Sequence, residues 1–221
     1  MKNSRKISLL LVLAMILISL VLPMSASAAE VATLLEDNFN SYETVDALKA
    51  KWGIDTNSST TITPASIAKG TGADNSTAFQ LNRTTGTDWI MKHFTTVIAD
   101  EGVLKATLKI KNDYKVVDGV TQYFDTFIAF GSKNNNGKFL PALFISGGVL
   151  YTGQNSAKYG TKVCEMANGE WYDIEFTYDV ATKDFAITVS KDGEECGTAS
   201  LVPPQGVGSM TAVETMRIQL W

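Results

Sequence analysis

Alternating apolar and polar residues dominate residues 170–193, and this pattern is typical of β-strands with one buried face. The apolar positions of the first strand fall at every second residue: Tyr172, Ile174, Phe176 and Tyr178. Turn residues follow at 179–184, and alternation resumes at Phe185. Asp192-Gly193 then favours a tight hairpin turn, in which both central residues have positive φ. The stretch predicts two antiparallel strands and the start of a third.

The rest of the chain repeats this theme in shorter pieces. Residues 103–111 alternate apolar residues with lysine and threonine, which predicts another half-buried strand. Further strands are expected at 60–63, 79–81, 88–94, 123–130, 140–145, 149–152, 161–166, 194–201 and 215–221. Only residues 43–51 indicate helix, one or two turns capped by Thr44 or Asp46. Roughly a dozen short strands without a long helix predict an antiparallel β-sandwich or jelly roll.

The first 28 residues have a different character. Lys2, Arg5 and Lys6 precede an apolar run, and small residues follow, ending in Ala26-Ser27-Ala28. This organisation predicts a secretory signal peptide at 1–28 and a secreted jelly-roll domain at 29–221. A membrane anchor is the alternative, but the apolar run is shorter than the roughly 20 residues that a spanning helix needs. No later stretch of the sequence is long and apolar enough to span a bilayer.

Charge narrows the partners of this domain. Without the predicted signal peptide, the chain has 16 basic and 23 acidic residues, which gives a net charge of −7. An acidic exported protein without a basic stripe is a poor nucleic-acid binder, and strongly anionic polymers are disfavoured as ligands.

The chain has two cysteines, Cys164 and Cys196. Export permits a disulfide between them. In a plain meander their strands would lie about three positions apart, near 14 Å, which is too far for a bond. Only another strand order would join them, so a disulfide and two buried free thiols both remain open.

Three segments carry a resemblance to a known family. They are DNF at 37–39, EGVLKATLKIK at 101–111 and GEWYDIEFTYDVATKDFAITVSKDG at 169–193. The chain resembles the concanavalin A-like lectin/glucanase superfamily, and most closely its laminin G-like modules in bacterial extracellular proteins. The resemblance implies a curved two-sheet jelly roll that holds sugars on its concave face, often as an accessory module beside polysaccharide-degrading enzymes.

Two further expectations come from this resemblance. Some members bind calcium at a sheet edge, which makes Asp37 a candidate metal ligand. Such domains commonly close with a strand of the type DDI or DNI, whereas this sequence stops at Trp221. The resemblance therefore implies that the last strand is missing, because the sequence is part of a longer protein, or that the domain is shorter than its relatives.

The sequence contains few residue patterns that are typical of enzyme active sites. Glycosidases of the same fold use a Glu-x-Asp-x-Glu strand, which places three acids on one face. Here Glu170 precedes Asp173 by three residues, so only Asp173 and Glu175 share a face. A jelly-roll lyase could use Arg217 with a tyrosine. The single histidine, His93, cannot assemble a typical zinc site.

Sugar binding needs only an aromatic ring and nearby polar groups. Three groups lie on the polar sides of their strands: Tyr123 with Asp125, Trp171 with Asp173, and Arg217 with Gln219 and Trp221. Trp89 is a further candidate. We therefore predict a non-catalytic carbohydrate-binding or accessory module for cell-wall or environmental polysaccharide. The alternatives are a jelly-roll glycoside hydrolase or polysaccharide lyase, and a purely structural or adhesive extracellular domain.

Overall fold

The computed structural model describes residues 36–52, 54–56, 66–80, 88–99, 102–111, 113–122, 125–131, 139–155, 158–201 and 212–220. The predicted leader, the predicted strand at 60–63, Tyr123 and Trp221 lie outside these residues. The backbone of residues 88–93 is described, but the side chains of Trp89 and His93 are not. Within the described part, no helix is long and apolar enough to cross a membrane.

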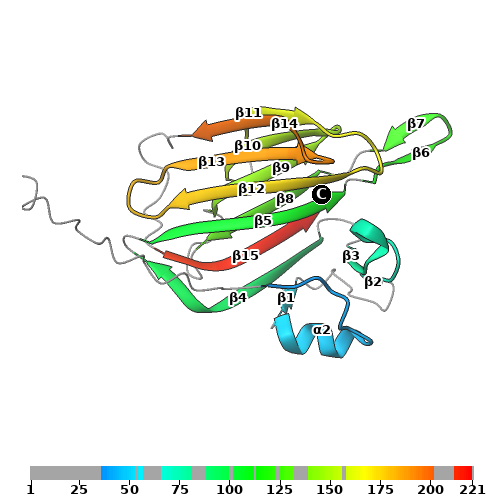
Figure 1. Ribbon diagram of the computed structural model, residues 1–221, viewed down its shortest axis with the longest axis horizontal. Coiled ribbons are helices and arrows are strands. Elements are labelled where there is room, and N and C mark those ends of the chain that lie inside the picture. Colours follow the sequence, from blue (N-terminus) through cyan, green and yellow to red (C-terminus); the bar gives the residue numbers. More distant parts are fainter. Residues whose placement is uncertain are drawn as a thin grey trace, which may run out of the picture. The chain divides into compact units, whose positions relative to one another are not determined.

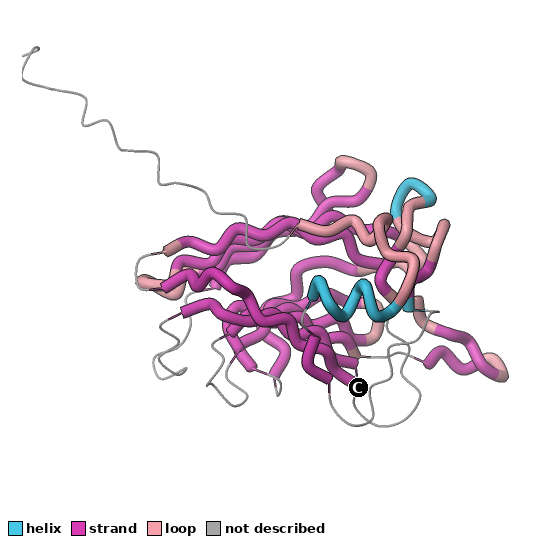
Figure 2. Tube along the Cα trace, turned by 90° about the horizontal axis from the view of Figure 1, so that it is seen from below, coloured by secondary structure: helices cyan, strands magenta, loops and turns pink. Residues whose placement is uncertain are grey.

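The described strands form two main sheets, whose pairings are all antiparallel (Figure 1). The larger sheet has seven strands in the order β1 (Ile54–Thr56), β4 (Asp88–Ala99), β15 (Ala212–Leu220), β8 (Thr126–Gly131), β9 (Phe139–Ser146), β10 (Val149–Asn155) and β11 (Lys158–Glu165). The smaller sheet has the order β14 (Glu194–Leu201), β13 (Phe185–Lys191), β12 (Trp171–Asp179) and β5 (Val103–Lys111). Figure 2 shows the strands stacked in two layers. The predicted antiparallel jelly-roll sandwich is confirmed.

Smaller elements sit beside the sandwich. Two short ladders pair β2 (Ile67–Ala68) with β3 (Ala78–Phe79), and β6 (Lys115–Val117) with β7 (Val120–Gln122). A short 3-10 turn, η2, spans Ala73–Asn75. The helix α2 (Val45–Trp52) matches the predicted helical segment, and the Thr44 hydroxyl accepts a hydrogen bond from the Ala47 amide at 3.2 Å. Thr44 is therefore the N-cap, as expected.

The main hydrophobic core lies between the two sheets. The inward residues of β12 are those that the alternation predicts, and Ile174 and Tyr178 are completely buried. From the opposite sheet, Phe130 places its ring 5.0 Å from that of Phe176, measured between centroids. In β12 and β13 every second side chain enters this layer, which is the packing expected of a sandwich.

The tight turns follow the sequence signals closely. Asp192 and Gly193 have φ of 54° and 82°, and Gly147 and Gly148 have φ of 56° and 76°. Both pairs join adjacent antiparallel strands. Two-residue turns with positive φ suit such hairpins because their backbone twist matches the twist of the strands. Asp118 and Gly119 form a third such turn between β6 and β7, which the sequence analysis did not anticipate.

The edge strands β11 and β14 of the two sheets lie side by side (Figure 1). A Cβ atom on Gly197 would stand 2.2 Å from the carbonyl oxygen of Val163 and 3.3 Å from Cβ of Cys164. The strands of Cys164 and Cys196 are therefore neighbours across the two sheets, which is the other strand order that the sequence left open. Both cysteines are free thiols, and Cys164 is buried whereas Cys196 is exposed.

The strand β15 lies inside the seven-stranded sheet, paired with β4 on one side and β8 on the other. Its own backbone groups are thus bonded on both sides. A closing strand after Trp221 stays a prediction.

Candidate functional site

The face of the seven-stranded sheet that points away from the four-stranded sheet is called the outer face here. On β8, Ile128 and Phe130 belong to the main core, so Phe127 and Ala129 point to the outer face. Phe127 stands opposite Phe144 of β9 in the ladder, with 4.8 Å between the ring centroids. Although they face away from the core, Phe127 and Phe144 are 0% and 2% exposed. The centre of the outer face is a second apolar cluster.

Two of the predicted site residues border this cluster. The strand β15 places Gln219 beside Phe127 and Arg217 beside Ala129. On its other side, Gln219 stands in register with Trp89 of β4. Gln219 is 5% exposed, and its Oε1 atom has no hydrogen-bond partner among the described residues. Arg217 is half-buried, and burial lowers the pKa of its guanidinium group.

The rim of the outer face carries further polar and aromatic groups. Asp125 precedes Phe127 by two residues, which puts it on the same side of the strand, and it is partly exposed. Tyr151 of β10 pairs with Phe144, packs against the apolar cluster and is also partly exposed. A ring at the rim, an arginine and an amide oxygen thus share one face of the sheet.

Trp171 and Asp173 lie on the opposite side of the molecule from the outer face. They belong to the solvent-facing side of the four-stranded sheet, since their neighbours Tyr172 and Ile174 enter the core. The Lys111 ammonium lies 5.6 Å from the centre of the Trp171 ring, and Lys109 forms a 2.8 Å ion pair with Asp173. Glu175 is exposed on the same side. Asp173 and Glu175 have the surroundings of surface acids.

Asp37 has a structural environment. Its carboxylate accepts hydrogen bonds from the Tyr42 hydroxyl, from Nε1 of Trp52 at 2.7 Å and from the Phe39 amide at 2.8 Å. The Asp37 side chain is 4% exposed. These donors take up the oxygens that a calcium ion would need, so the surroundings of Asp37 do not fit a metal. In the described residues, no group of three or more His, Cys, Asp or Glu side chains could hold one.

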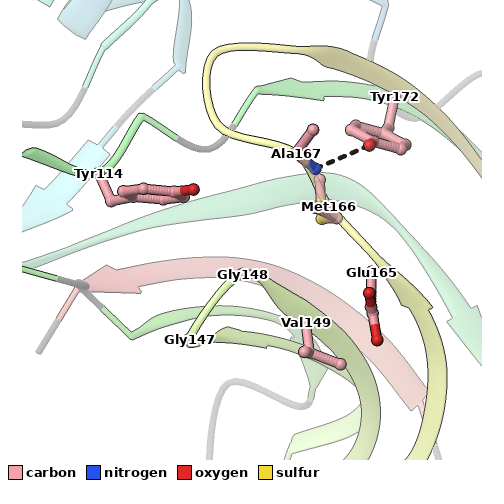
Figure 3. Close-up of a pocket in the computed structure, with 8 residues that line it drawn as sticks. All are labelled: Tyr114, Gly147, Gly148, Val149, Glu165, Met166, Ala167 and Tyr172. Atoms are coloured by element: carbon pink, nitrogen blue, oxygen red, sulfur yellow. Dashed lines mark hydrogen bonds between the residues drawn. The ribbon is translucent and has the colours of Figure 1, made fainter. Parts of the chain in front are cut away.

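A separate cleft of about 450 Å³ opens at one end of the sandwich (Figure 3). It is lined by the turn Gly147-Gly148 with Val149, by residues 165–167 after β11, by Tyr114 and by Tyr172. In Figure 3, Tyr114 reaches across the opening toward Met166 and Ala167. The sequence analysis did not single out this cleft, because its walls come from separate segments between Tyr114 and Tyr172 that only the strand pairing brings together.

The structure therefore divides the predicted sugar-binding residues. It brings Asp125, Arg217 and Gln219 to the outer face, and it places Trp171 and Asp173 on the other sheet. Sequence reasoning missed Tyr151, which alternation in 149–152 could have assigned to the face opposite Leu150.

No protein-family model matches the sequence, and no curated protein is similar to it in sequence. Among solved structures, peanut lectin superposes with a TM-score of 0.51 and 13% identity, over 85% of this chain and 89% of the lectin. A legume lectin-like domain from Entamoeba histolytica gives a TM-score of 0.46 and 9% identity, over 86% of this chain and 90% of that domain.

Two further similarities were found. Arcelin-5, a lectin-like defence protein of Phaseolus vulgaris, gives a TM-score of 0.47 at 14% identity over 75% of this chain and 82% of that protein. A sialidase matches 60% of this chain with 14% identity and a TM-score of 0.41, and the match spans 10% of the sialidase. At such low identities the similarity establishes the fold alone.

Proposed function

We propose that this chain, which has the concanavalin A-like jelly-roll fold of the legume lectins, is a non-catalytic carbohydrate-binding module. We further propose that residues 1–28 direct its export and that its ligand is a cell-wall or environmental polysaccharide. The glycan would lie on the outer face, where Arg217, Gln219 and Tyr151 offer a charged donor, an amide acceptor and a ring.

The observation that carries the proposal is the buried side-chain oxygen of Gln219, which has no hydrogen-bond partner among the described residues. A buried polar atom without a partner costs about 1–3 kcal/mol in a folded protein. The Oε1 atom of Gln219 is such an acceptor among the described residues, and Gln219 lies two residues from the half-buried Arg217 on the same face of β15. A sugar hydroxyl that gained access to this buried atom would satisfy it by donating a hydrogen bond. Partly exposed Tyr151 and Asp125 would contact the same glycan at the rim.

A glycan array and a pull-down with insoluble polysaccharides test the proposal. We expect Gln219→Ala and Arg217→Gln each to weaken binding about tenfold, which corresponds to one lost hydrogen bond of about 1.4 kcal/mol. Glu175→Gln is the matched control, because it removes a polar group from the other sheet. Absence of binding to any glycan by the folded protein would contradict the proposal.

The alternative functions are separable in the same experiments. A reducing-sugar assay detects a glycosidase, and an unsaturated-product assay detects a lyase. Activity that disappears in Glu175→Gln while the fold persists would favour the glycosidase. An adhesive domain would bind neither array glycans nor polysaccharide. The expected contributions of Tyr123, Trp171, Asp173 and Trp221 stay predictions that alanine variants would examine one by one.

A further inference from the structure

The end cleft is lined by both apolar and polar groups, and it is separate from the site proposed on the outer face. Val149 and Met166 contribute apolar surface, Tyr114 contributes a ring, and Glu165 contributes a carboxylate. A volume of about 450 Å³ falls in the range of small-ligand sites. No residue of the outer-face cluster lines the cleft, although β10 contributes Val149 to the cleft and Tyr151 to the cluster.

Hydrogen bonds hold the walls of the cleft in place. The Tyr114 amide donates to Oδ1 of Asn168 at 2.8 Å, which ties the Tyr114 segment to the turn before β12. The Met166 amide donates to the carbonyl oxygen of Gly148 at 2.7 Å and thereby joins the segment after β11 to the turn between β9 and β10. A cleft whose walls are already fixed loses little entropy when a ligand enters.

Tyr172 supplies a donor at this position. Its hydroxyl oxygen accepts a hydrogen bond from the Ala167 amide at 2.9 Å, shown by the dashed line in Figure 3. No described residue accepts the hydroxyl proton of Tyr172, whose side chain is 4% exposed and lines the cleft. A ligand oxygen is the missing acceptor.

The carboxylate of Glu165 offers the cleft a hydrogen-bond acceptor and a negative charge. Lys162 donates to its carboxylate at 2.7 Å and lowers the pKa of Glu165, so the group stays ionised near neutral pH. Since that lysine is already engaged with Glu165, the cleft offers an anion no cation of its own among its lining residues. The net charge of −7 without the leader also opposes an anionic ligand.

We propose that the end cleft is a second glycan subsite, which binds a neutral sugar residue and discriminates against uronic acids. The sugar ring stacks on Tyr114, one hydroxyl donates to Glu165, and a ring or hydroxyl oxygen accepts from Tyr172. The ligand class rests on the proposed function, whereas the location and the charge preference rest on the cleft itself.

The test is titration of the chain with neutral xylo-, gluco- and manno-oligosaccharides and, in parallel, with oligogalacturonate. We expect saturable binding of a neutral oligosaccharide, weakened about tenfold by Tyr114→Ala and nearly unchanged by Tyr114→Phe. We expect Glu165→Gln to narrow the preference for neutral over uronic oligosaccharides. Amide chemical shifts of Gly148 and Ala167 should move on binding, which reports the cleft independently of the variants.

Gln219→Ala separates this inference from the proposed function. If Gln219→Ala abolishes all glycan binding while Tyr114→Ala changes nothing and the Gly148 and Ala167 signals stay still, the cleft is not a subsite and the outer face stands. If Tyr114→Ala and the amide shifts report binding while Gln219→Ala has no effect, the cleft stands and the outer face does not. Tighter binding of oligogalacturonate than of every neutral probe would overturn the charge argument.

Discussion

The buried tyrosines Tyr178 and Tyr42 differ in whether their hydroxyl groups are hydrogen-bonded, and one substitution at each position can measure the energetic effect. Tyr178 is 0% exposed, and its hydroxyl has no hydrogen-bond partner among the described residues. Tyr42 is 3% exposed, and its hydroxyl donates to the Asp37 carboxylate. Replacement by phenylalanine removes the same oxygen atom at both positions, so the two changes isolate the effect of the hydrogen bond.

The expected changes in the free energy of unfolding have opposite signs. Tyr178→Phe removes an unsatisfied buried hydroxyl, and we expect it to raise stability by about 1 kcal/mol, since such a group costs about 1–3 kcal/mol and some packing is lost. Tyr42→Phe removes a hydrogen bond to a charged group, worth about 1.5–3 kcal/mol, and leaves Asp37 with its Trp52 and Phe39 donors. We expect that variant to be less stable by about 2 kcal/mol.

Urea titration followed by tryptophan fluorescence measures both changes, and thermal melting checks their direction. For a domain of this size about 1 kcal/mol corresponds to roughly 2–4 °C in Tm. If Tyr178→Phe lowers stability as much as Tyr42→Phe does, the hydroxyl of Tyr178 has a partner and the reasoning fails.

Alkaline pH provides a second readout of the same residues. Burial raises the pKa of Tyr178 from 10.0 to about 12, and burial together with the hydrogen bond to Asp37 raises that of Tyr42 to about 12. The unfolded chain then releases these protons near pH 10, whereas the folded chain holds them until about pH 12. Stability is therefore fully present below pH 10 and declines as the pH rises toward 12. This decline should be smaller in either phenylalanine variant.

The contact between β11 and β14 makes two further predictions. Gly197→Ala should destabilise the domain by about 2 kcal/mol or more, because a Cβ atom there would lie 2.2 Å from the backbone oxygen of Val163. Ser200→Ala on the same strand is the control, and equal Tm values for the two variants would show that the edges do not meet. A maleimide should label Cys196 in the native protein but Cys164 only after unfolding, since Cys164 is buried and burial raises its pKa to about 11. Labelling of neither cysteine without reductant would reveal a disulfide instead.

Local structure was largely predictable from the sequence. The alternation around Phe176 correctly gives the buried side of β12, and the Asp192-Gly193 and Gly147-Gly148 pairs correctly give the turns. These features depend on neighbours within a few residues, for which side-chain period and backbone sterics suffice. The hairpin at 115–122 carries an equally clear Asp118-Gly119 signal between valines, so this turn is also encoded locally.

The grouping of the site residues could not be predicted in the same way. Alternation gives each residue a side of its own strand, but it does not say which sheet the strand joins. Trp171 and Arg217 both carry a polar-side assignment, yet their strands β12 and β15 belong to different sheets. The burial of Gln219 has the same origin, since Phe127, its neighbour in the ladder, belongs to a strand far away in the sequence. Sequence separations of about 90 residues have to close before such neighbours exist.

The segment DNF at 37–39 belongs to the resemblance in fold, whereas the surroundings of Asp37 do not fit the calcium ion that the resemblance implies. The resemblance correctly implies the fold, and it implies Asp37 as a candidate calcium ligand because some members of the superfamily bind calcium at a sheet edge. Here Asp37 instead gathers donors from Tyr42 and Trp52, and the ring of Phe39 lies 5.3 Å from that of Trp52, measured between centroids. A carboxylate surrounded by O–H and N–H donors satisfies its charge without a metal, whereas calcium needs several further oxygen ligands. The acid therefore joins the first described residues to α2, a role that its local sequence fits equally well.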